Sequence, residues 1–139
     1  MAEDRSILVV GIDGELLGVE RDTGAVRWTH ELVDGGYGAV QLAANGGQVF
    51  ASADGDLVYC VDYATGATVW RSQTKSPGRA TLLIEPGCLV VAKGASVDCF
   101  ARGDGTLLWS LPLAGRDLRR CALAFPDNVA QADDAASSK

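Results

Sequence analysis

Long apolar segments and positive charge are both scarce in the 139-residue sequence. The longest apolar run covers residues 7–10 and reaches Ile12 only through Gly11, whereas a membrane-spanning helix needs about 20 apolar residues. Residues 1–5 are acidic and lack the basic and apolar regions of a signal peptide. Twelve Lys and Arg stand against 18 Asp and Glu, a net charge of −6, which argues against binding nucleic acid or anionic lipid through bulk charge. We therefore expect a cytoplasmic protein that binds neither membrane nor nucleic acid.

Motifs for metal, phosphate and nucleophile chemistry are also missing from the sequence. The single histidine, His30, has no serine or cysteine motif beside it that would build a catalytic triad. No glycine-rich loop is followed by Lys-Ser or Lys-Thr, and no acidic residues have the spacing of a calcium loop. The cysteines fit no Cys-x-x-Cys motif and are expected to be free thiols; they are Cys60, Cys88, Cys99 and Cys121. The sequence thus predicts no catalytic residue, no metal site and no cofactor.

What the sequence does contain is a repeat marked by tryptophan and glycine. Trp28, Trp70 and Trp109 are spaced by 42 and 39 residues. A glycine stands four positions before each of them, at Gly24, Gly66 and Gly105. Between the glycine-containing turns the segments alternate or are β-branched and aromatic, as half-buried strands are. A β-rich period of about 40 residues is typical of the four-stranded blades of a β-propeller.

The repeat predicts an all-β propeller of twelve strands, lettered A to D from the inside of each blade outward. The first unit has B, C and D strands at residues 7–10, 15–20 and 25–32. Two complete units follow, at 38–43, 48–53, 57–62 and 67–74, and at 79–84, 88–93, 96–101 and 106–111. A final A strand is expected at 118–125. Residues 1–125 then hold the repeats, and residues 126–139, which are poor in bulky apolar side chains, form a disordered tail.

These units resemble the PQQ-like, or tryptophan-docking, β-propeller repeat, in which a Leu-Tyr-Ala-Leu-Asp-like strand is followed by Ala-x-Thr-Gly and a strand that carries Trp. Residues 14–28 and 57–70 fit the pattern, and the third unit keeps Gly105 and Trp109. WD40 blades share the period but end in Trp-Asp, whereas Thr, Arg and Ser follow the tryptophans here. The resemblance implies that each tryptophan packs between adjacent blades on the Thr-Gly turn. The expected blade-docking residues are Trp28, Trp70, Trp109, Gly24, Gly66 and Gly105.

Three blades are too few to close a ring, since propellers usually have about four to eight. The predicted chain starts without an A strand and ends with one, so two copies could complete each other. The strand at 118–125 of one copy would pair with residues 7–10 of the other, giving a two-fold, six-bladed ring. The dimer-closure residues are Ile7, Leu8, Val9, Val10, Leu118, Cys121, Leu123 and Phe125. Two alternatives stay open: a piece of a longer propeller, or a ring completed by a different protein.

A cluster of arginines near the expected channel mouth raises the question of an anion site. Inner strands line the channel, and the arginines at the start of two of them could form a cationic rim for an anionic peptide or phosphate. They are Arg79, Arg116, Arg119 and Arg120. We favour the simpler reading, in which they pair with acids such as Asp117 and Glu85 at the blade junction.

Taken together, these features favour a non-catalytic scaffold or protein-interaction module that acts as a homodimeric ring. A sensor that binds a small ligand in the channel is the alternative. A quinoprotein dehydrogenase is disfavoured, because those enzymes of the same family are larger, eight-bladed, usually exported and hold calcium with pyrroloquinoline quinone. The family also includes a lipoprotein scaffold of outer-membrane β-barrel assembly, whose location is not expected here.

Overall fold

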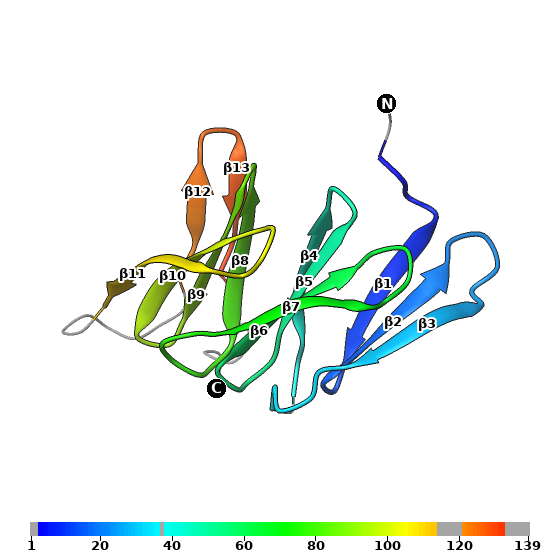
Figure 1. Ribbon diagram of the computed structural model, residues 1–139, viewed down its shortest axis with the longest axis horizontal. Coiled ribbons are helices and arrows are strands. Elements are labelled where there is room, and N and C mark those ends of the chain that lie inside the picture. The colour runs from blue at the N-terminus through cyan, green and yellow to red at the C-terminus, as the bar shows by residue number, and fades with distance from the viewer. Residues whose placement is uncertain (1–2, 37, 114–120, 133–139) are drawn as a thin grey trace.

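The computed structural model describes residues 3–36, 38–113 and 121–132, and every regular element in these ranges is a β-strand. Four antiparallel sheets follow one another along the chain (Figure 1). The first holds β1 (Ile7–Ile12), β2 (Glu15–Glu20) and β3 (Val26–Glu31); the second β4 (Gln41–Asn45), β5 (Gln48–Ser52), β6 (Leu57–Asp62) and β7 (Thr68–Gln73); the third β8 (Ala80–Glu85), β9 (Cys88–Lys93), β10 (Ser96–Ala101) and β11 (Leu107–Pro112); the last β12 (Leu123–Phe125) and β13 (Asn128–Ala130).

Within each sheet the strands pair in chain order, so every connection is a hairpin. The later sheets touch through β8, the first strand of the third sheet, which contacts β4 of the second sheet and both β12 and β13 of the last. The strand prediction is confirmed for all eleven strands up to residue 111, with ends that differ by at most three residues. The first sheet also lacks an inner strand, as predicted.

The end of the described chain differs from the prediction of a strand at 118–125 and a disordered tail. The strand β12 begins only at Leu123, and β13 pairs with it over three residues. The tail prediction is therefore wrong for residues 126–132, and the described residues hold thirteen strands instead of twelve. Leu118 lies outside the described residues.

A tight turn explains the extra strand. Asp127 follows Pro126 with a φ of 63°, in the same place where Gly87, with a φ of 83°, follows Pro86 between β8 and β9. Aspartate tolerates this left-handed backbone better than most residues do. The Asn128 side chain then donates a hydrogen bond of 2.6 Å to the Ile84 carbonyl, which holds the hairpin against β8.

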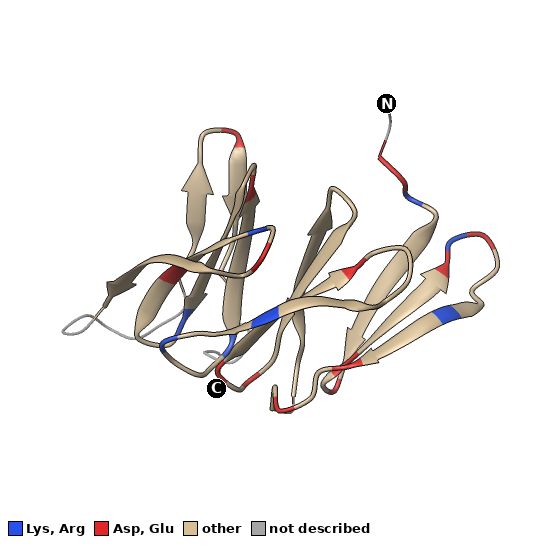
Figure 2. Ribbon diagram, viewed as in Figure 1, with Lys and Arg blue, Asp and Glu red and all other residues tan. Residues whose placement is uncertain are grey.

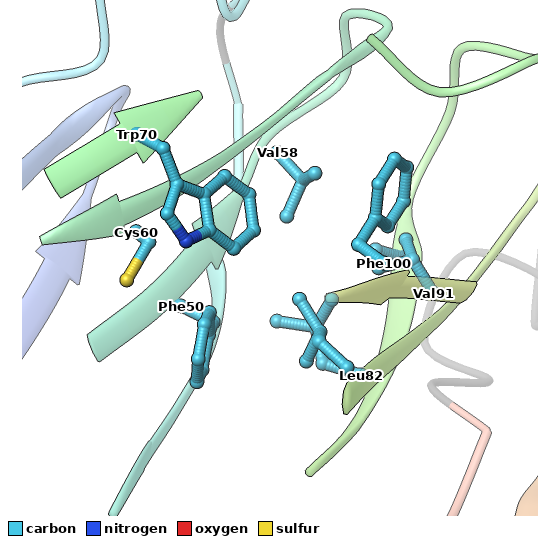
Figure 3. Close-up of a cluster of buried hydrophobic side chains, with 9 residues drawn as sticks. Phe50, Val58, Cys60, Trp70, Leu82, Val91 and Phe100 are labelled. Carbon is cyan, nitrogen blue, oxygen red and sulfur yellow. The ribbon is translucent and has the colours of Figure 1, made fainter. Parts of the chain in front are cut away.

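The apolar core lies between the sheets, where the faces of neighbouring sheets meet. Figure 3 shows the cluster between the second and third sheets, where the Trp70 ring lies among side chains of both. Its centroid is 5.9 Å from that of Phe50 and 6.4 Å from that of Phe100. A second cluster joins the first and second sheets, and a third joins the third sheet to β12 and β13. In the described residues no helix is long and apolar enough to cross a membrane.

A matched pair of valines tests this core. Val91 is fully buried in the cluster of Figure 3, and Val69 on β7 is half-exposed. We expect Val91→Ala to lower the free energy of unfolding by about 2–3 kcal/mol, because it removes two buried methyl groups and leaves a void. Val69→Ala should cost less than about 1 kcal/mol. Urea unfolding measures both, and equal losses would contradict the described packing.

Candidate functional site

The most specific contacts between the sheets are made by two of the three tryptophans. On β3, a register shift opposite Gly18 and Val19 leaves Arg27 without a cross-strand partner and sets Trp28 against Gly18. A Cβ at Gly18 would overlap the indole ring, so only glycine fits there. The same register shift recurs opposite Cys60 and opposite Cys99 in the next two sheets.

From this position the Trp28 indole reaches the second sheet. Its Nε1 donates a 3.0 Å hydrogen bond to the Tyr63 carbonyl. Its ring covers Gly66, where a Cβ would lie 2.5 Å from Cδ2 of the indole. Trp28 as a whole is 8% exposed. An indole thus seals the junction between the first two sheets and satisfies its N–H in doing so.

Trp70 makes the same contact with the third sheet. Its Nε1 donates a 2.7 Å hydrogen bond to the Arg102 carbonyl, and a Cβ at Gly105 would lie 2.6 Å from its ring. The residue two positions after each tryptophan adds a second contact: His30 Nδ1 lies 3.1 Å from the Gly66 carbonyl oxygen, and Ser72 Oγ donates to the Gly105 carbonyl at 2.5 Å. His30 therefore lies at a sheet junction.

Trp109 and Gly24 are not brought together with any such partner among the described residues. Trp109 is 49% exposed on β11, the outer strand of the third sheet. Gly24 is exposed in the first sheet, and a Cβ there would have no heavy atom within 4 Å. The structure thus pairs Trp28 with Gly66 and Trp70 with Gly105, and it leaves the last tryptophan and the first glycine at opposite ends.

The predicted dimer-closure residues occupy β1 and the segment around β12. Ile7 is buried and exchanges hydrogen bonds with the Tyr63 hydroxyl, Leu8 is exposed, and Val9 and Val10 are half-buried. Among the later ones, Cys121 and Leu123 are half-buried and Phe125 is exposed. In the single chain β12 pairs with β13, while β2 is the one strand of the described residues that pairs with β1.

The predicted arginine rim cannot be assembled from the described residues. Arg116, Arg119 and Arg120 lie outside them, as does Asp117, and Arg79 directly precedes β8. Glu85 accepts a hydrogen bond from the Asn128 amide. Figure 2 shows basic and acidic positions mixed over turns and strands of several sheets.

All four cysteines are free. Burial raises the pKa of the Cys60 and Cys99 thiols to about 11, with neighbouring Cys88 contributing at Cys99. These two thiols are therefore protonated at neutral pH and suited to packing opposite an indole, not to nucleophilic attack. Among residues 3–36, 38–113 and 121–132, no three His, Cys, Asp or Glu side chains lie close enough to hold a metal ion.

Sequence reasoning missed Lys93, which links the second and third sheets. It is 2% exposed, and its Nζ donates to the carbonyls of Ala53 at 3.0 Å, of Leu57 at 3.4 Å and of Gly55. Burial lowers its pKa to about 8, partly opposed by Asp54 and Asp56. A lysine at the end of a strand gives no local signal of burial, because its surroundings come from another sheet.

Comparison with known proteins identifies the repeat. A family model described as outer membrane protein assembly factor BamB, of the PQQ type, matches residues 4–134. The chain belongs to this PQQ-like propeller family. Its sheets are accordingly blades, the first of β1–β3, the second of β4–β7 and the third of β8–β11.

Solved structures agree on the fold. BamB from Moraxella catarrhalis is 19% identical with a TM-score of 0.69, over 90% of this chain and 44% of that one. The computationally designed Ika4 protein is 23% identical with a TM-score of 0.73, and the match covers 94% of this chain and 82% of the Ika4 chain. A europium-containing methanol dehydrogenase is 14% identical with a TM-score of 0.63, and the match covers 78% of this chain and 23% of the dehydrogenase chain. This PQQ-like chain thus spans less than half of the BamB chain, and no curated protein matches it significantly.

Gly105 tests the contact between blades. Gly105 and Gly87 have φ angles of 78° and 83°, so alanine costs each a similar left-handed strain of about 1 kcal/mol. The two sites differ in what the new methyl group meets: at Gly105 it meets the Trp70 indole, whereas at Gly87 it has no heavy atom of the described residues within 4 Å. We expect Gly105→Ala to lower the free energy of unfolding by about 3 kcal/mol in total, and Gly87→Ala by about 1 kcal/mol. Equal losses in urea unfolding would contradict the contact.

Lys93 should make stability depend on pH. Its folded-state pKa of about 8 lies below the ordinary 10.5, so between these values the unfolded chain binds more protons and stability rises with pH. From pH 7.5 to 9.5 the wild type should gain about 1–2 kcal/mol of unfolding free energy relative to Lys93→Met. The difference between the two proteins cancels other titrating groups. A constant difference in urea unfolding at both pH values would refute the buried charge.

Proposed function

We propose that this chain is a non-catalytic protein-interaction scaffold that acts in the cytoplasm as a homodimeric propeller ring. The observation that carries the proposal is the contrast between the inner and the end faces of the three blades. Between blades the apolar side chains are buried. At the two ends large apolar side chains are exposed: Trp109 and Leu111 on β11, and Leu8 and Ile12 on β1.

Such end faces favour packing against another blade of this type, as a second copy of the chain would supply. Contiguous exposed apolar surface typically marks a protein–protein contact, and closed two-fold symmetry is the commonest arrangement of soluble oligomers. Two copies would supply six blades, within the usual range. In the proposed ring, β12 of one copy pairs with the free edge of the six-residue β1 of the other, in the place that the three-residue β13 takes in the single chain.

The family supports the scaffold role. The model that matches the chain is described as an assembly factor, and assembly factors work on other proteins. Propellers present the loops of every blade on one face, which suits contact with a partner protein. Because the chain spans 44% of the BamB chain, a ring of two copies would restore the surface that one copy lacks.

The mass of the pure chain in solution tests the proposal. We expect light scattering coupled to gel filtration to give twice the chain mass of 14.5 kDa at micromolar concentration. A mass of 14.5 kDa up to the solubility limit would contradict the homodimer, and would instead fit either alternative, a piece of a longer propeller or a ring completed by a different protein.

A thermal-shift screen separates the scaffold from a small-ligand sensor. A ligand that binds only the folded state raises the melting temperature in proportion to the logarithm of its concentration. We expect no concentration-dependent shift with small metabolites on the dimer. A saturable shift with one of them would favour the sensor instead.

A further inference from the structure

Among the residues that the structure describes, the tryptophan–glycine contact is made twice, and one tryptophan and one glycine of the repeat take no part in it. Trp28 and Trp70 are 8% and 7% exposed because the next blade covers them, whereas Trp109 is 49% exposed. Gly66 and Gly105 are covered by those two indoles, whereas a Cβ at Gly24 would have no heavy atom of the described residues within 4 Å. Within residues 3–36, 38–113 and 121–132, the third blade therefore presents an indole that no glycine turn receives, and the first blade a glycine turn that no indole covers.

The socket at Gly24 has the same backbone as the two that are filled. The φ angles of Gly24, Gly66 and Gly105 are 78°, 76° and 78°. Each glycine N–H bonds the carbonyl four residues earlier, at 3.0, 2.8 and 2.9 Å. The Arg21 carbonyl therefore holds the place that the Tyr63 and Arg102 carbonyls hold beneath Trp28 and Trp70.

The frame that fixes this carbonyl is also repeated. The Arg21 N–H bonds the Ser6 carbonyl at 2.9 Å, as Tyr63 bonds Gly47 at 3.0 Å and Arg102 bonds Gly87 at 3.1 Å. The surface beside the glycine is open, since a Cβ at Gly24 would have no heavy atom of the described residues within 4 Å. The socket is thus formed before anything binds to it.

Trp109 cannot reach this socket in its own chain. The β11 strand lies at one end of the row of blades and the β1–β3 blade at the other, with a whole blade between them (Figure 1). A second copy brings an identical blade with an identical turn.

We infer that Trp109 of one copy docks on the Thr23–Gly24 turn of a second copy, with its Nε1 donating to the Arg21 carbonyl. The inference rests on the proposed homodimeric ring and names the contact that closes it. By two-fold symmetry each copy gives one indole and receives one. The contact continues an interface that the chain already builds twice, so it needs no new geometry.

One difference sets the strength of this contact. At the inner junctions, His30 and Ser72 add a second hydrogen bond to the glycine carbonyl. The equivalent residue after Trp109 is Leu111, which has no donor. The indole contact between copies therefore relies on apolar burial and one side-chain hydrogen bond. We expect the dimer to dissociate on dilution before the blades unfold.

The test measures the dimer dissociation constant of the full chain by sedimentation velocity. Trp109→Ala should raise it at least about 100-fold, since a buried tryptophan is a typical hot spot and each dimer contains two. Gly24→Ala should raise it similarly, because its methyl group fills the socket. The matched control is Gly87→Ala, whose φ of 83° brings the same strain without a contact, and its dissociation constant should stay within threefold of wild type.

The outcomes separate this inference from the proposed function. Circular dichroism first establishes that both variants are folded. We expect them to fold, because Trp109 and Gly24 are exposed in the single chain and their substitution removes no buried contact there. If the wild type is a dimer and both variants keep its dissociation constant, the docking is wrong and the ring stands. If the wild type is a monomer at every concentration, both are wrong. In the wild-type dimer, acrylamide quenching of Trp109 at the rate of a free indole would also overturn the docking.

Discussion

An indole lying on the glycine of the next blade is the interaction on which the rest of this structure depends. A flat ring fits between two blades only if nothing projects beneath it, which fixes glycine at Gly66 and Gly105. The ring also needs an acceptor for its N–H, which the Tyr63 and Arg102 carbonyls supply. The packing of the blades, the bulge in each outer strand and the glycine turn therefore all serve this one tryptophan–glycine contact.

The tryptophan–glycine contact gives the row of blades a direction. Each blade offers an indole on one face and a glycine turn on the other, so blades add head to tail, and a row of three leaves one of each unused. Buried polar links reinforce the inner junctions, as Lys93 does between the second and third blades. The ends carry the same surface without these partners, which is why we place the second copy there.

Most of the fold could be predicted from the sequence because its signals are local. The tryptophan and glycine period and the turn residues mark eleven strands within a few residues of their ends. The strand β13 escaped because Asn128–Ala130 is short and weakly apolar. Its turn gives a signal that could have revealed it, since Pro126-Asp127 matches Pro86-Gly87 in the preceding unit.

The candidate site was less predictable, since it depends on which blades meet. Sequence indicates which residues belong to the tryptophan contact, but the difference between covered Trp70 and exposed Trp109 arises only from the number of blades in the row. Lys93 is a similar case. Its burial and lowered pKa come from the turn of another blade, so its own strand gives no hint of them.

Hydrogen exchange of the three indole N–H groups, followed by NMR in the assembled protein, tests the central claim most directly. Every tryptophan in a closed ring has a carbonyl acceptor and a covering turn, so all three N–H groups should exchange slowly. Fast exchange at Trp109 at the rate of free indole, beside slow exchange at Trp28 and Trp70, would contradict closure through this contact.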